Sequence, residues 1–430
     1  MAQGNPDLVD RYPAKLKTEP LLKGRGDTPT IQYTFEGSLD IDQFSQAVNM
    51  VHDAVPKFRY YCDYLTMSWV LRPADFDYGD LVTKGSDVDE LREELTKRFE
   101  PIETCAFRFG VVEEDEGTFT LLMTYDHSQF DGVGAVVMTN MSVDVYNCLI
   151  SGESYEELLH TCRGMVDAPI EEVRPVGFGR KVALFWRLHR MKITDSTHFC
   201  PTVDEVTDIP RAMGREKRRE ATRLYDLNPL LVEGVSKNSL VTSIFTKAVA
   251  NAVGTQEYIG HMTLATGLPE TERSRYVGNY TGAITHNLPA AASIEENARL
   301  VHEELQAGRR RKTIEAFMWL FDATAPKIDK WKGDEVLRSV KKDPTLFCLT
   351  NWSNWRFAND PEYIKGCRSI EMSGRTGGEP RLENSQVINK PFALICMCPG
   401  NKVNLRIEAP LEDQLLPVMD ELDKIFGCKE

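Results

Sequence analysis

The chain has 430 residues, a length at which single hydrophobic cores usually give way to two domains. Hydrophobic residues make up 42% of it and charged residues 27%, as in ordinary soluble globular proteins. Its 51 basic residues against 65 acidic ones give a formal net charge of −14. This balance argues against nucleic acid as a partner, since phosphate binding needs a basic face.

The first residues, Met1–Asp7, lack the basic segment and apolar stretch of a secretory signal. No apolar run approaches the length needed to span a bilayer. The ten cysteines are scattered, with Cys396 and Cys398 as the tightest pair and no second Cys/His pair nearby. We therefore expect a cytoplasmic protein with no membrane partner, with buried free thiols and with no metal site.

The first 150 residues alternate between strand and helix patterns. The predicted elements are a strand over 31–37, helices over 39–54 and 88–98, strands over 107–112 and 119–125, and a long apolar helix over 132–149. From about 151 to 220 the pattern breaks up, with four prolines and mixed charges. We predict a crossover there, carrying one helix over 182–191.

The second half resumes the same mixture. It predicts a helix over 240–252, a strand over 259–266, an irregular stretch over 267–289, a helix over 293–310, strands over 346–350, 393–398 and 403–407, and a helix over 411–426. Both halves thus mix helices with strands, and the fold class is α/β with mixed sheets. The predicted organisation is an N-terminal domain over 1–165, a crossover linker over 166–220 and a C-terminal domain over 221–430.

The most informative segment follows the strand that ends at Tyr125. His127 lies between this strand and the helix that begins after Gly132, on a connection between rigid elements where functional side chains are commonly displayed. Histidine titrates near neutral pH, so it can take a proton from a hydroxyl or an amine. Asp131 is close enough to fix the turn, and Gly132 leaves room for a substrate or another backbone. Taken alone, the pattern also fits a surface turn before a helix.

The spacing His127-x-x-x-Asp131-Gly132 resembles the signature of the coenzyme-A-dependent acyltransferase superfamily. That group includes chloramphenicol acetyltransferase, the BAHD and trichothecene acyltransferases, and nonribosomal-peptide condensation domains. The resemblance continues beyond the motif. Residues 39–59 resemble the family's first helix and its "hP.lR" ending, and residues 239–252 resemble the helix after the crossover. Tyr276-Val277-Gly278-Asn279-Tyr280 resembles the "YFGN" loop, and residues 285–289 resemble the strand that follows it. Leu349-Thr350-Asn351-Trp352 resembles the "TSW" strand.

One departure concerns the Asp-Phe-Gly-Trp-Gly motif that BAHD enzymes carry after their "TSW" strand. The corresponding region here reads Arg356-Phe357-Ala358-Asn359-Asp360-Pro361. This argues against BAHD membership, whereas condensation domains and divergent fungal acyltransferases also lack the motif.

The resemblance implies two chloramphenicol-acetyltransferase-like domains with a tunnel between them, and His127 as general base. It implies transfer of an acyl group from acyl-coenzyme A, a co-substrate and not a bound cofactor, to a hydroxyl or amine of a small molecule, as in secondary metabolism, by a monomeric enzyme. The alternatives are a condensation-like enzyme whose donor is a thioester on an acyl carrier protein, and a silent binding protein on the same fold.

The remaining candidate residues each have two interpretations. Asp131 either orients His127 or anchors the loop, and we favour the anchor. Asn279 is a turn residue or a tunnel residue, while Thr350 and Trp352 contact the acceptor or belong to the core. His261 and His286 are expected to be structural.

Overall fold

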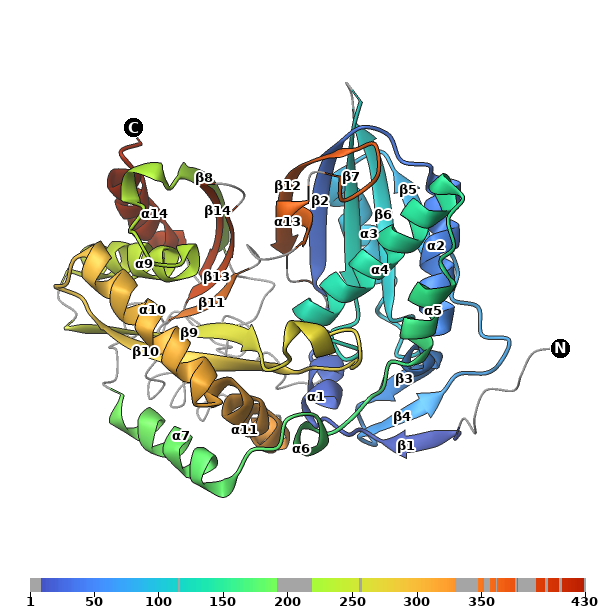
Figure 1. Ribbon diagram of the computed structural model, residues 1–430, viewed down its shortest axis with the longest axis horizontal. Helices are drawn as coiled ribbons and strands as arrows, with labels where there is room; N and C mark the ends of the chain where they lie inside the picture. The colour runs from blue at the N-terminus through green and yellow to red at the C-terminus, as the bar shows by residue number, and fades with distance from the viewer. Residues whose placement is uncertain are drawn as a thin grey trace. The chain divides into compact units, whose positions relative to one another are not determined.

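The computed structural model describes residues 9–114, 117–191, 219–254, 257–328, 347–351, 356–360, 362–375, 377, 392–398, 401–409 and 412–428 (Figure 1). The chain forms two compact units. Unit 1 comprises residues 1–173, 268–280 and 360–382, and unit 2 comprises 174–267, 281–359 and 383–430. Both units are therefore assembled from discontinuous segments, unlike the contiguous ranges 1–165 and 221–430 expected from the sequence.

Unit 1 is built on a five-stranded mixed sheet in the order β12-β2-β7-β6-β5. Its strands are β12 (Arg368–Arg375), β2 (Thr30–Glu36), β7 (Thr118–Tyr125), β6 (Phe107–Glu114) and β5 (Val82–Gly85). The β5–β6 pair is parallel and the other pairs are antiparallel. A separate three-stranded sheet joins β1 (Arg11–Pro13), β4 (Ser68–Leu71) and β3 (Tyr60–Asp63).

The helices of unit 1 are α1 (Thr18–Gly24), α2 (Ile41–Ala54), α3 (Val88–Lys97), α4 (Gly132–Ser151), α5 (Glu156–Arg163) and the single turn α6 (Ile170–Val173). Successive side chains of β7 point to opposite faces of the sheet. Leu122 packs with Leu91 and Leu95 of α3, whereas Met123 contacts Thr139 of α4. The sheet is thus covered by helices on both faces, and β7 lies between them.

Helix α4 is long and apolar enough, by length and composition alone, to cross a membrane, with half of its most apolar window buried. The expectation that no apolar run reaches this length was therefore wrong. The same property is common in core helices, and α4 packs against α2 and β7. We treat it as a core helix of unit 1.

Unit 2 is built on a six-stranded mixed sheet in the order β10-β9-β11-β13-β14-β8. Its strands are β10 (Thr281–Pro289), β9 (Tyr258–Thr266), β11 (Phe347–Asn351), β13 (Phe392–Met397), β14 (Lys402–Ala409) and β8 (Arg219–Asp226). Its helices include α7 (Phe178–Arg190), α9 (Lys237–Val253), α10 (Ile294–Arg310), α11 (Thr313–Ile328), the single turn α13 (Arg356–Asn359) and α14 (Glu412–Phe426).

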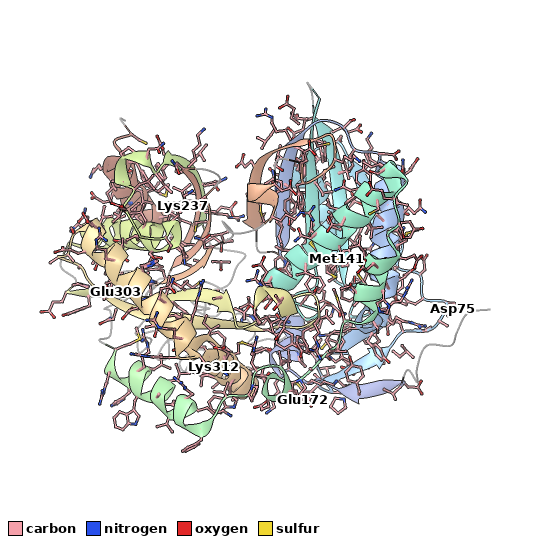
Figure 2. All side chains as sticks on the ribbon, viewed as in Figure 1. Asp75, Met141, Glu172, Lys237, Glu303 and Lys312 are labelled. Carbon is pink, nitrogen blue, oxygen red and sulfur yellow. The ribbon has the colours of Figure 1, made fainter. Side chains whose placement is uncertain are left out.

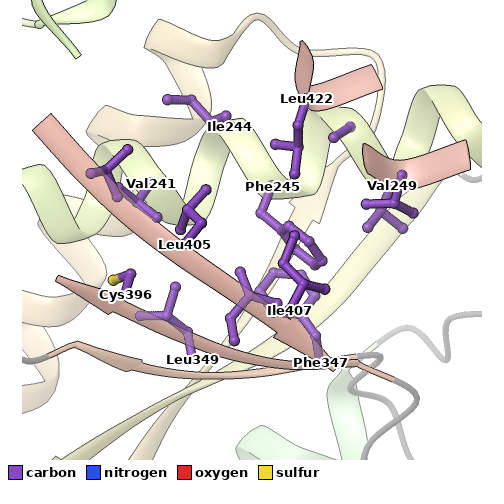
Figure 3. Close-up of a cluster of buried hydrophobic side chains, with 14 of the residues drawn as sticks. Val241, Ile244, Phe245, Val249, Phe347, Leu349, Cys396, Leu405, Ile407 and Leu422 are labelled. Carbon is purple, nitrogen blue, oxygen red and sulfur yellow. The ribbon is translucent and has the colours of Figure 1, made fainter. Parts of the chain in front are cut away.

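The core of unit 2 lies where α9 and α14 pack on the central strands. Figure 3 shows Phe245 of α9 and Leu422 of α14 above Phe347 and Ile407 of the sheet, all of them fully buried. Along β10, Ile284 packs with Val301 of α10. Its neighbour Ala283 faces the other way and packs with α7 and α11.

Most of the elements expected from the sequence form close to their predicted bounds. The irregular stretch predicted from the pattern over 267–289 is wrong in its second half, where β10 forms a nine-residue strand paired with β9. The strand over 285–289 that the resemblance implied lies within β10. Glycine, proline and polar residues around it obscured the alternation. Helix α11 was missed because its apolar residues are not confined to one side. Cys396 and Cys398 are buried free thiols, as predicted.

Candidate active site

His127 lies in the turn between β7 and α4, and its backbone is held from two sides. Its N–H donates to the carbonyl of Asp27 at 3.0 Å, and its carbonyl accepts from Nδ2 of Asn279 at 2.8 Å. The ring lies 5.6 Å from the ring of Tyr125. The side chain is partly exposed, while its Nδ1 is buried without a hydrogen-bond partner in the described part of the chain. The turn therefore fixes the backbone, and none of the described residues forms a hydrogen bond with the imidazole.

The residue before the histidine anchors this turn in the core. Asp126 forms a buried ion pair with Lys23 of α1. Its other oxygen accepts from the backbone N–H of Ser128 at 3.0 Å and from the Ser128 hydroxyl at 2.7 Å. Burial raises the pKa of Asp126, but the ammonium of Lys23 and these hydrogen bonds outweigh burial and lower it. Asp126 is therefore an ionised structural anchor one residue away from the candidate base.

Asp131 caps α4 and binds a second segment as well. Its Oδ1 accepts from the backbone N–H groups of Val133 and Gly134 at 3.1 and 3.0 Å, which is the capping geometry favoured for aspartate. Its Oδ2 accepts from the backbone N–H of Tyr280 at 3.0 Å. One carboxylate thus joins the start of α4 to residues 276–280, which also carry Asn279.

The two glycines at the start of α4 have different surroundings. A Cβ at Gly134 would lie 2.6 Å from the Cβ of Phe130, a fully buried residue that stacks on Tyr125 with 5.2 Å between the ring centroids. Among the described residues, a Cβ at Gly132 would meet nothing closer than the Tyr125 hydroxyl, 3.9 Å away. Gly134 is therefore required by packing, whereas Gly132 leaves space beside the turn.

Residues 276–280, hereafter the support loop, are themselves fixed in unit 1. Val277 donates to the carbonyl of Val166 at 3.0 Å, and Val166 donates to Arg275 at 3.0 Å. The hydroxyl of Tyr280 donates to the carbonyl of Ala168 at 2.8 Å. The loop is thus attached to residues 166–168, and it reaches the candidate site through Asn279 and the backbone of Tyr280.

A buried ionic cluster lies beneath the support loop. Lys57 donates to Glu19 at 2.6 Å and to the carbonyl of Val277 at 3.4 Å, and it lies 3.9 Å from Oδ1 of Asp167. The indole of Trp69 donates to Glu19 at 3.1 Å. Burial raises the pKa of Glu19 to about 8. Burial lowers the pKa of Lys57, but the two carboxylates outweigh it and the pKa is raised. Through its contact with the carbonyl of Val277, Lys57 links the cluster to the support loop, which holds the backbone of His127.

The structure brings four of the predicted site residues together. His127, Asp131, Gly132 and Asn279 all belong to unit 1 and meet around one turn. Thr350 lies in β11 of unit 2, where its side chain is partly exposed. Trp352 lies outside the described residues. In the part of the chain that the structure describes, no group of three or more His, Cys, Asp or Glu side chains is arranged to hold a metal ion.

Sequence reasoning missed the residues that support the turn. Lys23, Asp27 and Glu19 lie in a segment to which no element was assigned, and Asp126 was overlooked beside His127. Lys57 lies in the turn Pro56–Arg59 directly after α2, and the sequence alone indicated no role for it. The sequence does show a lysine, Lys57, shortly after α2 and an acidic residue, Asp126, directly before His127. Their partners, Glu19 and Lys23, are more than 35 residues away along the chain, so the sequence gives no sign of the pairing.

Comparison with known proteins gives a fold and no close relative. No family model matches the chain, and no curated protein sequence matches it. Solved structures, by contrast, do match the chain in fold. The first condensation domain of the CDA synthetase superposes with a TM-score of 0.63 at 10% identity, over 97% of this chain and 95% of that one.

The chain has the fold of a condensation domain.

Two further structures support this statement. The starter condensation domain of rhizomide synthetase, solved with C8-CoA and Leu-SNAC, gives a TM-score of 0.63 at 11% identity over 98% and 95% of the two chains. Polyketide synthase associated protein 5 from Mycobacterium tuberculosis gives 0.60 at 11% identity over 96% and 98%. The condensation-domain fold, which is of the chloramphenicol-acetyltransferase type, thus extends over nearly the whole chain. At these identities the likeness concerns the fold.

Proposed function

We propose that the chain is an acyltransferase in which His127 is the general base. The observation that carries this proposal is the placement of His127, whose backbone is fixed by Asp27 and Asn279 while its ring makes no hydrogen bond among the described residues. A base must be positioned and yet free to exchange a proton with a bound reactant. Because Nδ1 is buried, Nε2 is the nitrogen that remains for this exchange.

In the proposed reaction, Nε2 takes the proton of an acceptor hydroxyl or amine as its oxygen or nitrogen attacks the thioester carbonyl. The tetrahedral intermediate then collapses, the carbon–sulfur bond breaks, and the imidazolium returns the proton to the departing thiolate. No residue of the protein is acylated. The products are an ester or amide and a free thiol.

The donor we propose is acyl-coenzyme A. A neighbour with the same fold, the starter condensation domain of rhizomide synthetase, was solved with C8-CoA, which supports this choice. A carrier-protein-bound thioester is the second candidate, because other neighbours are condensation domains of the CDA synthetase and of the Monacolin K polyketide synthase. The acceptor we propose is a small molecule of secondary metabolism.

The test of the base is His127→Ala in an assay of thiol release from acyl-coenzyme A donors with a panel of alcohols and amines. We expect turnover to fall by about 10²–10⁴, because general base catalysis is typically worth this factor. Turnover should also fall at acid pH, because a general base must be unprotonated to act. The matched control is His160→Ala, since His160 lies exposed on α5. A His127 variant that keeps half of the wild-type turnover would disprove the assignment.

The donor is tested separately by supplying the same acyl group on coenzyme A or on an acyl carrier protein. We expect thiol release with coenzyme A alone. Release only from the carrier protein would replace the donor and leave the base intact. If the wild-type protein binds acyl-coenzyme A but releases no thiol from either donor, a silent binding protein would be favoured instead.

A further inference from the structure

Helix α7 carries large aromatic side chains on its outer side. Phe178 is 82% exposed and Trp186 is 56% exposed. Phe185 is 51% exposed, and its ring also packs edge-on against Trp319 of α11, with 6.2 Å between the ring centroids. A soluble surface rarely displays three such side chains within nine residues, because each leaves apolar area in water. Phe178 and Trp186 are eight residues apart, so they lie within a quarter turn of each other along one side of the helix. Figure 2 shows the side chains that project from α7.

The opposite side of α7 is firmly attached to unit 2. Leu184 is buried and packs with Ala283 and Phe317. Lys181 lies 4.1 Å above the ring of Trp319, and Arg187 donates to Thr285 of β10. The aromatic side chains are therefore presented by a helix that is already folded and held in place, and their exposure does not come from a loose end of the chain.

The same helix is basic in an acidic protein. Its 13 residues contain Arg180, Lys181, Arg187 and Arg190 and no Asp or Glu, whereas the whole chain carries a net charge of −14. In the described part of the chain, neither Arg180 nor Arg190 forms an ion pair with a carboxylate. The guanidinium of Arg190 lies 5.5 Å from the ring of Trp186. At Arg190, an exposed cationic group thus lies beside an exposed aromatic ring.

We propose that α7 is an interfacial helix that binds the surface of an anionic phospholipid membrane. The basic residues of α7 favour an anionic partner. The exposed Phe178 and Trp186 favour a partner into which apolar side chains can insert to a shallow depth. The outer side of a single helix is convex, which suits a plane better than a binding groove. This inference does not depend on the proposed acyl transfer, and it departs from the sequence-based expectation of no membrane partner.

The test is cosedimentation of the full chain with vesicles of phosphatidylcholine alone or of phosphatidylcholine mixed with phosphatidylglycerol. We expect binding to the mixed vesicles that weakens at high salt, and a blue shift of tryptophan emission that is absent in Trp186→Phe. The double variant Phe178→Ser, Trp186→Ser should bind at least about tenfold more weakly, because the apolar insertion is lost. The charge variant Arg180→Gln, Arg190→Gln should also bind more weakly.

The matched controls are Leu65→Ser, which removes an apolar side chain 72% exposed in unit 1, and Arg163→Gln with Lys402→Gln, which removes two exposed charges elsewhere. Both should bind as the wild type does. Circular dichroism melting curves of the α7 variants should match those of the wild type, because the altered side chains lie on the surface. Equal binding by wild type and α7 variants would overturn the proposal. So would a lack of binding to the mixed vesicles, including the case in which α7 binds an acidic protein instead.

Discussion

At the scale of single residues, the second carboxylate oxygen of Asp131 distinguishes its role from that of an ordinary helix cap. The cap needs one oxygen, whereas the bond from the N–H of Tyr280 uses the other. In Asp131→Asn, one of these two positions must hold an NH₂ group, which cannot accept. We expect a loss of about 1–3 kcal/mol in the free energy of unfolding, because a buried N–H loses its partner.

Turnover of Asp131→Asn should fall together with its melting temperature, and the acidic limb of the pH profile should keep its position. The control is Asp87→Asn, since Asp87 caps α3 through Oδ1 alone at an exposed position. That variant should melt close to the wild type. A fully stable Asp131→Asn whose acidic limb moves would show that Asp131 supports the charged imidazole.

At the scale of one element, the two glycines in the first turn of α4 have different roles: Gly134 is needed for packing, and Gly132 leaves space beside the turn. Gly134→Ala places a methyl group in contact with Phe130 at a distance that atoms do not tolerate, so we expect the protein to lose about 1–3 kcal/mol of stability. Gly132→Ala meets no such obstacle and should melt at the wild-type temperature or above it. Thermal melting of both variants checks this order.

The activity of the two glycine variants should follow the opposite order once stability is accounted for. Below its melting temperature, Gly134→Ala should keep its KM. Gly132→Ala should raise the KM for the acceptor if the space beside the turn admits substrate. An unchanged KM in Gly132→Ala would remove Gly132 from the site.

At the scale of the whole molecule, two stacked histidines make unit 2 sensitive to acid. His261 and His286 pair across β9 and β10 with 4.4 Å between ring centroids, and His261 also stacks on Phe347 at 4.8 Å. Both are buried. Burial lowers the pKa of His286 to about 3, with Arg187 adding to the effect, although Glu304 contacts its Nδ1. Burial and the neighbouring His286 lower the pKa of His261 well below its usual value.

The folded state keeps these rings neutral, whereas the unfolded chain protonates them below a pKa of about 6.5. The free energy of unfolding is therefore highest above pH 6.5 and decreases as the pH falls from there toward about 3. In this window, each histidine should lower the free energy of unfolding by about 1.4 kcal/mol for each unit that the pH falls. Urea unfolding between pH 7.5 and 5 measures the slope. His261→Phe retains the stack and should flatten the slope, whereas His160→Gln should not. Equal slopes in all three proteins would contradict this account.

Much of the fold could be predicted from the sequence, and less of the site. Helices such as α2 and α10 were foreseen because their apolar residues recur with helical spacing beside clear caps. The contacts that hold His127 and its neighbour Asp126 could not be predicted, because Lys23, Asp27 and Asn279 come from distant parts of the chain. His127 itself was found from the spacing of a motif, and its catalytic role stays a prediction. The structural role expected for His261 and His286 agrees with their burial.

The discontinuity of unit 1 has a consequence for synthesis on the ribosome. Residues 1–173 emerge first, yet the edge of β2 gains its partner β12 only when residues 368–375 have been made, and the support loop arrives with residues 276–280. Until then β2 presents an unpaired edge, which is a template for association with other chains. The nascent protein therefore passes through a long interval in which a chaperone would find this edge exposed, and expression of residues 1–173 alone should give an aggregating fragment.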